Sequence, residues 1–198
     1  MSKLFVDEIV HQSSQGSGTI TLGASGETIA LASGASVTGN GLVGITVGEE
    51  WKISSGVIET STTSAVFTSP TFYDGLGGSA QMTQSSGVFT FPSTGYYLVT
   101  FLLNVFDNGE DHRQVANYIK LATDGGTSFA NKGQGQNFIE HTSQGSNTHM
   151  SCSTHAILDI TNTSTHKVRF EYFFTGSSLF LYGDNQGTSA TFLRLGDT

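Results

Sequence analysis

Three of the six histidines and the single cysteine fall in one short stretch of the sequence: His141, His149, Cys152 and His155. Imidazole and thiolate groups are zinc ligands, and a Cys–His pair can supply a nucleophile and its base. Their spacing matches no zinc pattern. A β-strand here would place His149 and His155 on one face and Cys152 on the other, buried. We therefore expect structural roles and no metal; the alternative is a site on a threefold axis, with one His from each chain.

A second candidate site is the acidic run Asp107–Asp111, which reads DNGED. Carboxylate oxygens are ligands that calcium prefers, but the run lacks the spacing and the later bidentate Glu of a twelve-residue calcium loop. A solvated hairpin turn is the preferred interpretation. Asp184 and Asn185 are interpreted in the same way, because both residue types tolerate the left-handed geometry of tight turns.

Signatures of common enzyme classes are missing from the chain. No Gly-rich phosphate loop opens a helix, and no Gly-x-Ser-x-Gly elbow precedes one. Spacing alone does not exclude paired carboxylates for glycosidase chemistry. We expect a protein that is not an enzyme and uses no cofactor.

The composition favours many short strands joined by turns. Of 198 residues, 36% are hydrophobic and only 12% charged, with 25 Gly, 14 Phe and 2 Pro. The net charge of -8 argues against a nucleic-acid partner, since no basic stripe is present. No segment is long and apolar enough to span a membrane. The first ten residues include Lys3, Asp7 and Glu8 and do not form the apolar core of a signal peptide.

The N-terminal part is repetitive. Ile20 and Leu22 recur as Ile29 and Leu31, each pair followed by small residues and Gly. Such a ribbon buries too little surface to fold alone, but three copies around one axis could bury their apolar rows together. The alternative is a Ser/Gly linker. The expected organisation is an attachment peptide (1–18), a β shaft (19–50), a neck (51–64) and a head (65–198).

Alternation with a period of two dominates the head. One face of the segment 96–106 and one face of 168–174 should fill the space between two sheets. Turn signals, among them Gly133–Gly135, suit about eight to ten antiparallel strands. Apolar residues remain on the outward faces and indicate a subunit interface. The expected interface residues are Tyr96, Phe106, Phe173, Phe180, Tyr182 and Phe192.

Two segments of the head resemble the signature of the trimeric jelly-roll family that includes tumour necrosis factor and the globular head of the first complement component. The first pattern is filled by Gly87, Phe89, Pro92, Gly95 and Tyr97. The last hairpin is filled by Tyr182, Asp184, Asn185, Ser189, Phe192 and Leu195. The resemblance implies an all-β antiparallel jelly-roll sandwich that forms homotrimers and binds partners rather than catalysing reactions. Unlike animal members, the chain has no Gly-X-Y stalk.

The N-terminal repeats resemble those that precede heads in structural proteins of tailed phages, particularly marine ones. This resemblance implies a virion protein, assembled in the host cytoplasm, that displays its head as a fibre or knob for adhesion to the host surface. The alternative is a trimeric decoration protein that stabilises the capsid lattice. Other virion proteins would bind the N-terminal peptide through Leu4, Phe5, Val6, Ile9 and Val10.

A bacterial surface glycan is the expected external partner. Aromatic and amide side chains are the groups that bind sugars, and several lie in segments expected to be loops. The candidate residues are Tyr73, Asn131, Gln134, Gln136 and Asn137.

Overall fold

The computed structural model describes residues 45–53, 57–59, 63–67, 81–107, 109–140, 147–183 and 187–198. All regular structure in these ranges is β-strand, and none of their residues lies in a helix that could cross a membrane. The twelve strands are β1 (Gly48–Lys52), β2 (Val57–Glu59), β3 (Thr63–Ser64), β4 (Thr83–Ser85), β5 (Val88–Thr90), β6 (Gly95–Asp107), β7 (His112–Ala122), β8 (Ala130–Ile139), β9 (Thr148–Ile160), β10 (Lys167–Phe174), β11 (Leu179–Leu181) and β12 (Ser189–Gly196).

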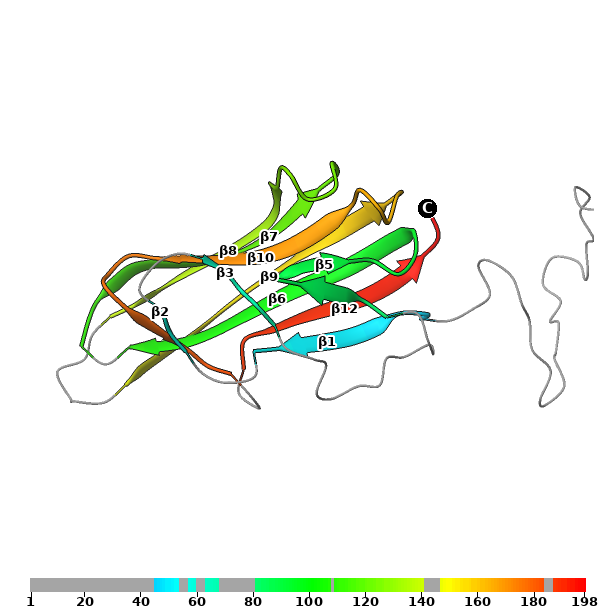
Figure 1. The fold of residues 1–198 in the computed structure, drawn as a ribbon. Helices are drawn as coiled ribbons and strands as arrows, with labels where there is room; N and C mark the ends of the chain where they lie inside the picture. The colour runs from blue at the N-terminus through cyan, green and yellow to red at the C-terminus, as the bar shows by residue number, and fades with distance from the viewer. Residues whose placement is uncertain are drawn as a thin grey trace, which may run out of the picture. The chain divides into compact units, whose positions relative to one another are not determined.

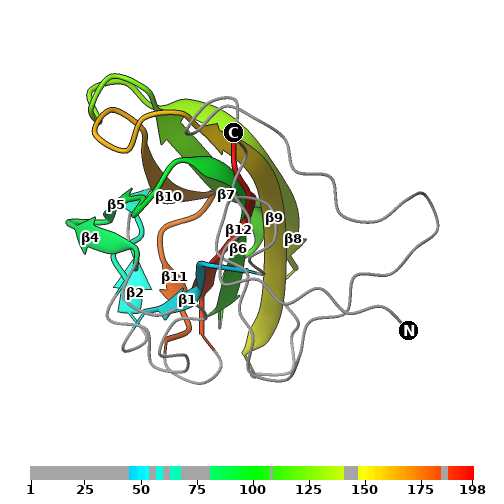
Figure 2. The same cartoon turned by 90° about the vertical axis from the view of Figure 1, so that its right-hand side faces the viewer.

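The strands form two six-stranded antiparallel sheets packed face to face (Figures 1 and 2). The first sheet has the order β1-β12-β6-β11-β2, and β9 pairs with β6 on its other side. The second sheet has the order β4-β5-β10-β7-β8, and β3 pairs with β10. The chain crosses between the sheets at β2–β3, β5–β6, β6–β7, β8–β9, β9–β10 and β10–β11, so each sheet combines strands that are distant in sequence.

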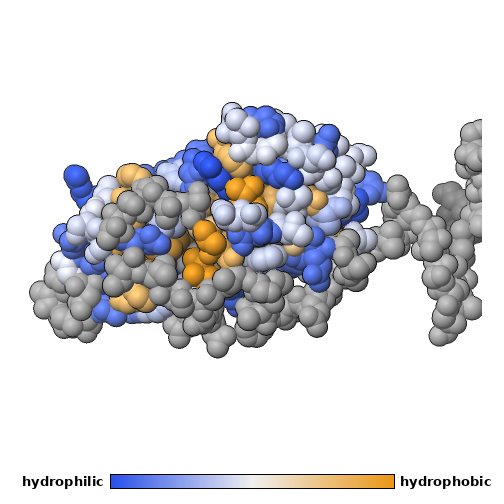
Figure 3. Space-filling model, viewed as in Figure 1, coloured by the Kyte–Doolittle hydropathy of each residue, from blue (hydrophilic) through white to orange (hydrophobic). Residues whose placement is uncertain are grey.

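The core lies between the sheets and has the predicted alternation. Every second residue of β6 from Tyr97 to Val105 is at most 1% exposed, and so are Val168, Phe170 and Tyr172 of β10. Aromatic rings meet at the centre, where Phe170 lies 5.1 Å from Phe101 between ring centroids. In Figure 3, hydrophobic residues gather toward the middle of the described surface in view, among largely hydrophilic ones.

Phe192 belongs to this core and not to an outward face, which corrects its assignment to the subunit interface. It is 0% exposed, and its ring lies 5.1 Å from that of Phe89 and 5.8 Å from that of Phe170. The reason is strand register. Phe192 pairs with Val99, and paired residues of an antiparallel ladder point to the same face. Val99 points inward, so Phe192 does too.

The sandwich begins before residue 65. β1 pairs with β12, and the Trp51 ring packs edge-on against Phe89 at 5.2 Å. Glu49 is 2% exposed, yet its carboxylate accepts hydrogen bonds from Trp51 Nε1 (2.9 Å) and from the Met82 backbone N–H (2.8 Å). These bonds offset the cost of burying the carboxylate. Residues 1–44, with the expected attachment peptide and most of the expected shaft, lie outside the described residues.

One edge of the sandwich is closed by close backbone approach between β8 and β9 (Figure 2). Gly133 and Gly135, expected in a turn, lie within β8. A Cβ on Gly135 would come 2.5 Å from the Ser153 carbonyl oxygen, and one on Gly133 would come 2.9 Å from that of His155. The glycines are therefore needed for sheet-to-sheet contact and not for a turn.

Asn117, which is 0% exposed, ties this edge together. Its Nδ2 donates to the carbonyl oxygens of Phe101 (2.9 Å) and Cys152 (3.0 Å). Its Oδ1 accepts from the Gly135 backbone N–H at 3.1 Å. One buried amide thus links β6, β7, β8 and β9, and each of its groups is satisfied.

The sandwich has two distinct ends. β1 starts opposite the end of β12, since Gly48 pairs with Leu193, and Tyr96 near the start of β6 pairs with Gly196. β6 finishes at the opposite end, where Asp107 pairs with Thr148. We call this the distal end; it lies away from the C-terminus in Figure 1.

Candidate subunit interface

The outward face of the first sheet carries an apolar row near the end where β1 starts. Leu98 of β6 lies between Ile157 of β9 and Leu193 of β12 in the strand register. Ile157 is 66% exposed, and Tyr96, two residues before Leu98, is 42% exposed. We call Tyr96, Leu98, Ile157 and Leu193 the proximal cluster. A lone sandwich would leave this surface in water.

Near the distal end, the same face carries four rings: Phe106, His149, Phe180 and Tyr182. Phe106 pairs with His149 on one side and with Phe180 on the other. Its ring centroid lies 4.4 Å from Phe180 and 4.9 Å from Tyr182. None of the four side chains is fully buried. We call this set the distal aromatic cluster.

Polar side chains separate the two clusters. Thr100 pairs with His155 and with Thr191, and the Ser151 hydroxyl donates to Asn104 Oδ1. Apolar patches divided by polar groups that can form hydrogen bonds are typical of protein–protein interfaces. The outward face of the first sheet is thus suited to contact with another protein surface.

The structure brings most of the expected interface residues to this face. Tyr96 lies in the proximal cluster, and Phe106, Phe180 and Tyr182 meet in the distal aromatic cluster. Phe173 is separate, because it lies in β10 of the second sheet and pairs with Ala116.

Sequence reasoning missed Ile157, the most exposed large hydrophobic residue among those described. A signal for it was present. The alternation that places His149 and His155 on the outward face of β9 continues for two more residues and reaches Ile157.

The predicted alternation of His149, Cys152 and His155 along a strand is confirmed. His149 and His155 are exposed on one face of β9, and Met150 and Cys152 are buried on the other. Burial raises the pKa of the Cys152 thiol, and its Sγ lies 3.4 Å from Asn117 Oδ1, to which it donates. No group of three or more His, Cys, Asp or Glu side chains within the described ranges is arranged to hold a metal ion. His141 lies outside those ranges.

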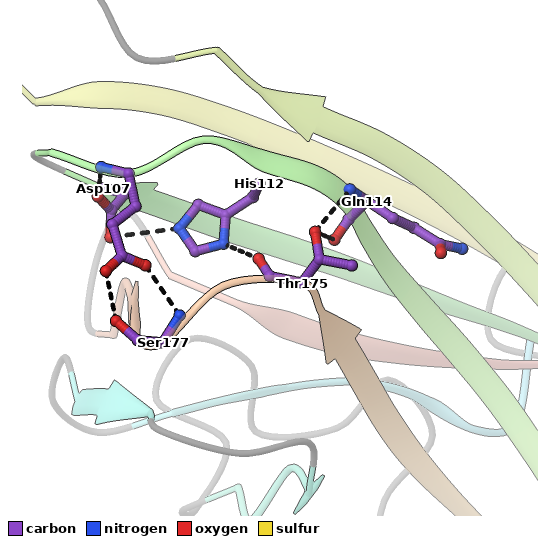
Figure 4. A network of polar contacts seen from close by, with 6 residues as sticks. Asp107, His112, Gln114, Thr175 and Ser177 are labelled. Atoms are coloured by element: carbon purple, nitrogen blue, oxygen red, sulfur yellow. Dashed lines mark hydrogen bonds and ion pairs between the residues drawn. The ribbon is translucent and has the colours of Figure 1, made fainter.

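Asp107 and Glu110, at either side of the residue of the acidic run that is not described, make contacts that fasten the connection between β6 and β7 to the one between β10 and β11 (Figure 4). Asp107 Oδ1 accepts from the Glu110 backbone N–H at 2.8 Å. The Glu110 carboxylate accepts from the Ser177 backbone N–H (2.8 Å) and hydroxyl, and these bonds lower the pKa of Glu110. The interpretation of the run as a hairpin turn was wrong, because β6 and β7 belong to different sheets and do not pair. The run belongs to a connection that crosses between the sheets, and Glu110 fastens it to a second connection.

His112, which the sequence did not single out, is buried in the same network (Figure 4). Its Nδ1 lies 2.5 Å from the Thr175 carbonyl oxygen, and its Nε2 lies 3.3 Å from Asp107 Oδ2. Gly176 passes directly over the imidazole, since a Cβ there would come 2.8 Å from its ring atoms. The arrangement fixes the two distal connections to each other and leaves no room for substrate at the imidazole.

The residues expected in ligand-binding loops lie in a strand instead. Asn131, Gln134, Gln136 and Asn137 all belong to β8, so the prediction of loops was wrong. The glycines between them suggested turns but serve the approach to β9. Asn137 Nδ2 donates to the Ser151 carbonyl oxygen at 3.0 Å. Tyr73 lies outside the described residues.

Comparison with known proteins identifies the fold. No protein-family model matches the chain, and no curated protein matches its sequence. Among solved structures, Eiger TNF from S. frugiperda superposes with a TM-score of 0.58 at 12% identity, covering 77% of this chain and 94% of that one. Murine APRIL at pH 8.5 gives a TM-score of 0.51 at 11% identity, covering 75% and 99%. At this level of identity the likeness concerns the fold alone, and it confirms that the chain has an antiparallel jelly roll like that of the tumour necrosis factor-like proteins.

Proposed function

We propose that this chain is a homotrimeric virion structural protein of a tailed phage, whose jelly-roll head is displayed for adhesion to the host cell. The observation that carries the trimer is the outward face of the first sheet, with its proximal and distal aromatic clusters. The resemblance of the N-terminal repeats to those of phage structural proteins supports the virion location.

Self-association accounts for apolar surface that a single sandwich does not use. The first sheet has already filled its inner face with the core, so the exposed parts of Ile157 and of the distal aromatic cluster are apolar surface that the core does not use. Burial of apolar surface yields about 25 cal/mol per Å². A contact that covers both clusters would therefore stabilise an oligomer, and the trimer is the assembly that the jelly-roll resemblance implies.

The layout suits presentation of the distal end. The described chain enters the sandwich at Gly48, beside the end of β12, and the distal connections lie at the other end of β6. An N-terminal attachment would therefore leave the distal end pointing outward. Three copies held together make individually weak contacts effective, because later contacts form at a high local concentration.

A capsid decoration protein is the second candidate, because the same apolar face would serve a trimer seated on a capsid lattice. Copy number separates the two. Quantitative mass spectrometry of purified virions should give a few to some tens of chains for a fibre or spike, whereas hundreds would identify a decoration protein.

Removal of residues 1–18 tests the attachment role directly. The truncated chain should remain a soluble trimer and no longer join virions; a variant with Leu4, Phe5 and Val6 changed to Ser serves as a second form of the same test. Incorporation of both variants at normal copy number would show that the head itself makes the attachment, which would favour the decoration role.

A further inference from the structure

Phe138 is an exposed aromatic residue at the distal end of the head. It lies in β8, next to the buried Ile139, and 61% of its surface is accessible. It stands in a shallow depression of about 360 Å³. The described residues that line the depression are Asp111, Arg113, Phe138, Ile139 and Glu140.

Strand pairing holds the two sides of the depression together. His112 pairs with Ile139, which brings the segment 111–113 beside 138–140. His112 is itself buried and in contact with Thr175 and Asp107. Each segment therefore has a buried residue at its centre, His112 in one and Ile139 in the other, and this holds the backbone of the two segments in place.

The lining combines an aromatic ring with charges of both signs. Phe138 offers an apolar surface, Asp111 and Glu140 are carboxylates, and Arg113 is a guanidinium. The two carboxylates disfavour a phosphate or another anion, and the guanidinium disfavours a simple cation. Burial of Arg113 and Glu140 against another protein subunit would carry a desolvation cost for each charge.

A neutral sugar ring suits a surface made of Phe138, Arg113 and Glu140. Its C–H face can pack on an aromatic ring, while its hydroxyl groups donate to carboxylates and accept from a guanidinium. We propose that the depression at Phe138 is a subsite for one ring of a neutral saccharide. Phe138 is the platform, and Arg113 and Glu140 orient the hydroxyl groups, with Asp111 at the margin of the depression. This inference rests on the proposed adhesive function for its biological role and names the ligand class for it.

Saturation-transfer NMR with the full-length protein tests the subsite. The probes are the methyl glycosides of glucose, galactose, mannose, rhamnose and N-acetylglucosamine, with glucuronate and glucosamine as charged counterparts. We expect saturable binding of at least one neutral glycoside, with the strongest transfer to the C–H protons of one ring face. Binding should weaken about tenfold in Phe138→Ala and persist in Phe138→Trp. Val66→Ala is the control, because Val66 is 54% exposed and does not line the depression.

Several results would overturn the subsite: no saturable binding of any neutral glycoside, preference for a charged sugar, or equal binding by Phe138→Ala and the wild type. Light scattering of Phe138→Ala is a further check, since loss of the oligomer would show that Phe138 is a subunit contact. The test is independent of the virion proposal. Sugar binding by a protein present at decoration copy number would leave the subsite standing and reject the fibre. A fibre copy number without sugar binding would reject the subsite and leave the fibre proposal standing.

Discussion

The Tyr182 hydroxyl lies 3.0 Å from Nδ1 of His149, and the two rings stack at an interplanar angle of 13°. Tyr182 follows β11 and His149 lies in β9, and these strands pair with opposite sides of β6. The two residues therefore meet over Phe106, whose ring lies 5.5 Å from that of His149. This contact joins three strands of the first sheet into one aromatic surface.

If this surface is buried between subunits, loss of its rings should weaken the oligomer. Phe106→Ser and Tyr182→Ser should each cost about 2 kcal/mol of association free energy, as is usual for central aromatic contacts. Sedimentation across a dilution series measures the change. Phe173→Ser is the matched control, because Phe173 lies on the second sheet. If Phe173→Ser alone dissociated the oligomer, the interface would lie on the second sheet, which would contradict the proposal.

Asn117 should be the costliest polar residue to replace. Asn117→Leu removes two donors to backbone carbonyls and leaves the Gly135 N–H without its acceptor. Unsatisfied groups at a buried site should lower the free energy of unfolding by about 3 kcal/mol. Urea denaturation measures this. Asn137→Ala, which removes two bonds of an exposed side chain, should cost about 1 kcal/mol, because the freed groups can bind water. Equal losses for the two variants would contradict the role given to Asn117.

Gly135→Ala should separate β8 from β9. The added Cβ meets a backbone oxygen of Ser153 at 2.5 Å, and a backbone atom cannot move aside as a side chain can. The expected cost is about 3 kcal/mol, measured by thermal unfolding. Gly125→Ala is the control. Its Cβ would meet nothing within 4 Å, so only its φ of +82° opposes the change, at about 1 kcal/mol.

Glu110 should contribute stability that is lost in acid. Hydrogen bonds from Ser177 lower its pKa from the ordinary 4.5 in the folded chain. A lowered folded-state pKa means that the contribution is complete above pH 4.5 and disappears as the pH falls through the lower folded value. Glu110→Gln should therefore be less stable than the wild type at neutral pH, and the difference should shrink below pH 4.5. Urea midpoints measured across pH provide the test, and a difference that is constant with pH would refute it.

Local patterns were sufficient to predict much of the fold. Alternation in β6 and β10 fixed which side chains fill the core, because successive residues of a strand point to opposite faces. The same rule placed His149 and Cys152 on opposite faces of β9. The two motif segments pointed to the jelly roll that the structural comparisons confirm.

Features that depend on contacts between distant strands were not predictable. Phe192 was predicted to lie on an outward face. Its inward orientation is set by pairing with Val99, which is far away in sequence. Gly133 and Gly135 looked like a turn because a sequence does not show that another sheet lies 2.5 to 2.9 Å from their missing Cβ atoms. His112 went unnoticed because its partners come from two separate connections.

The assembly itself is tested most directly by the mass of the full-length protein in solution. Multi-angle light scattering at micromolar concentration should give three times the 20.9 kDa chain mass, and the value should persist on moderate dilution. A stable, folded species of one chain mass at that concentration would contradict the account, because the proximal and distal aromatic clusters would then be open to water.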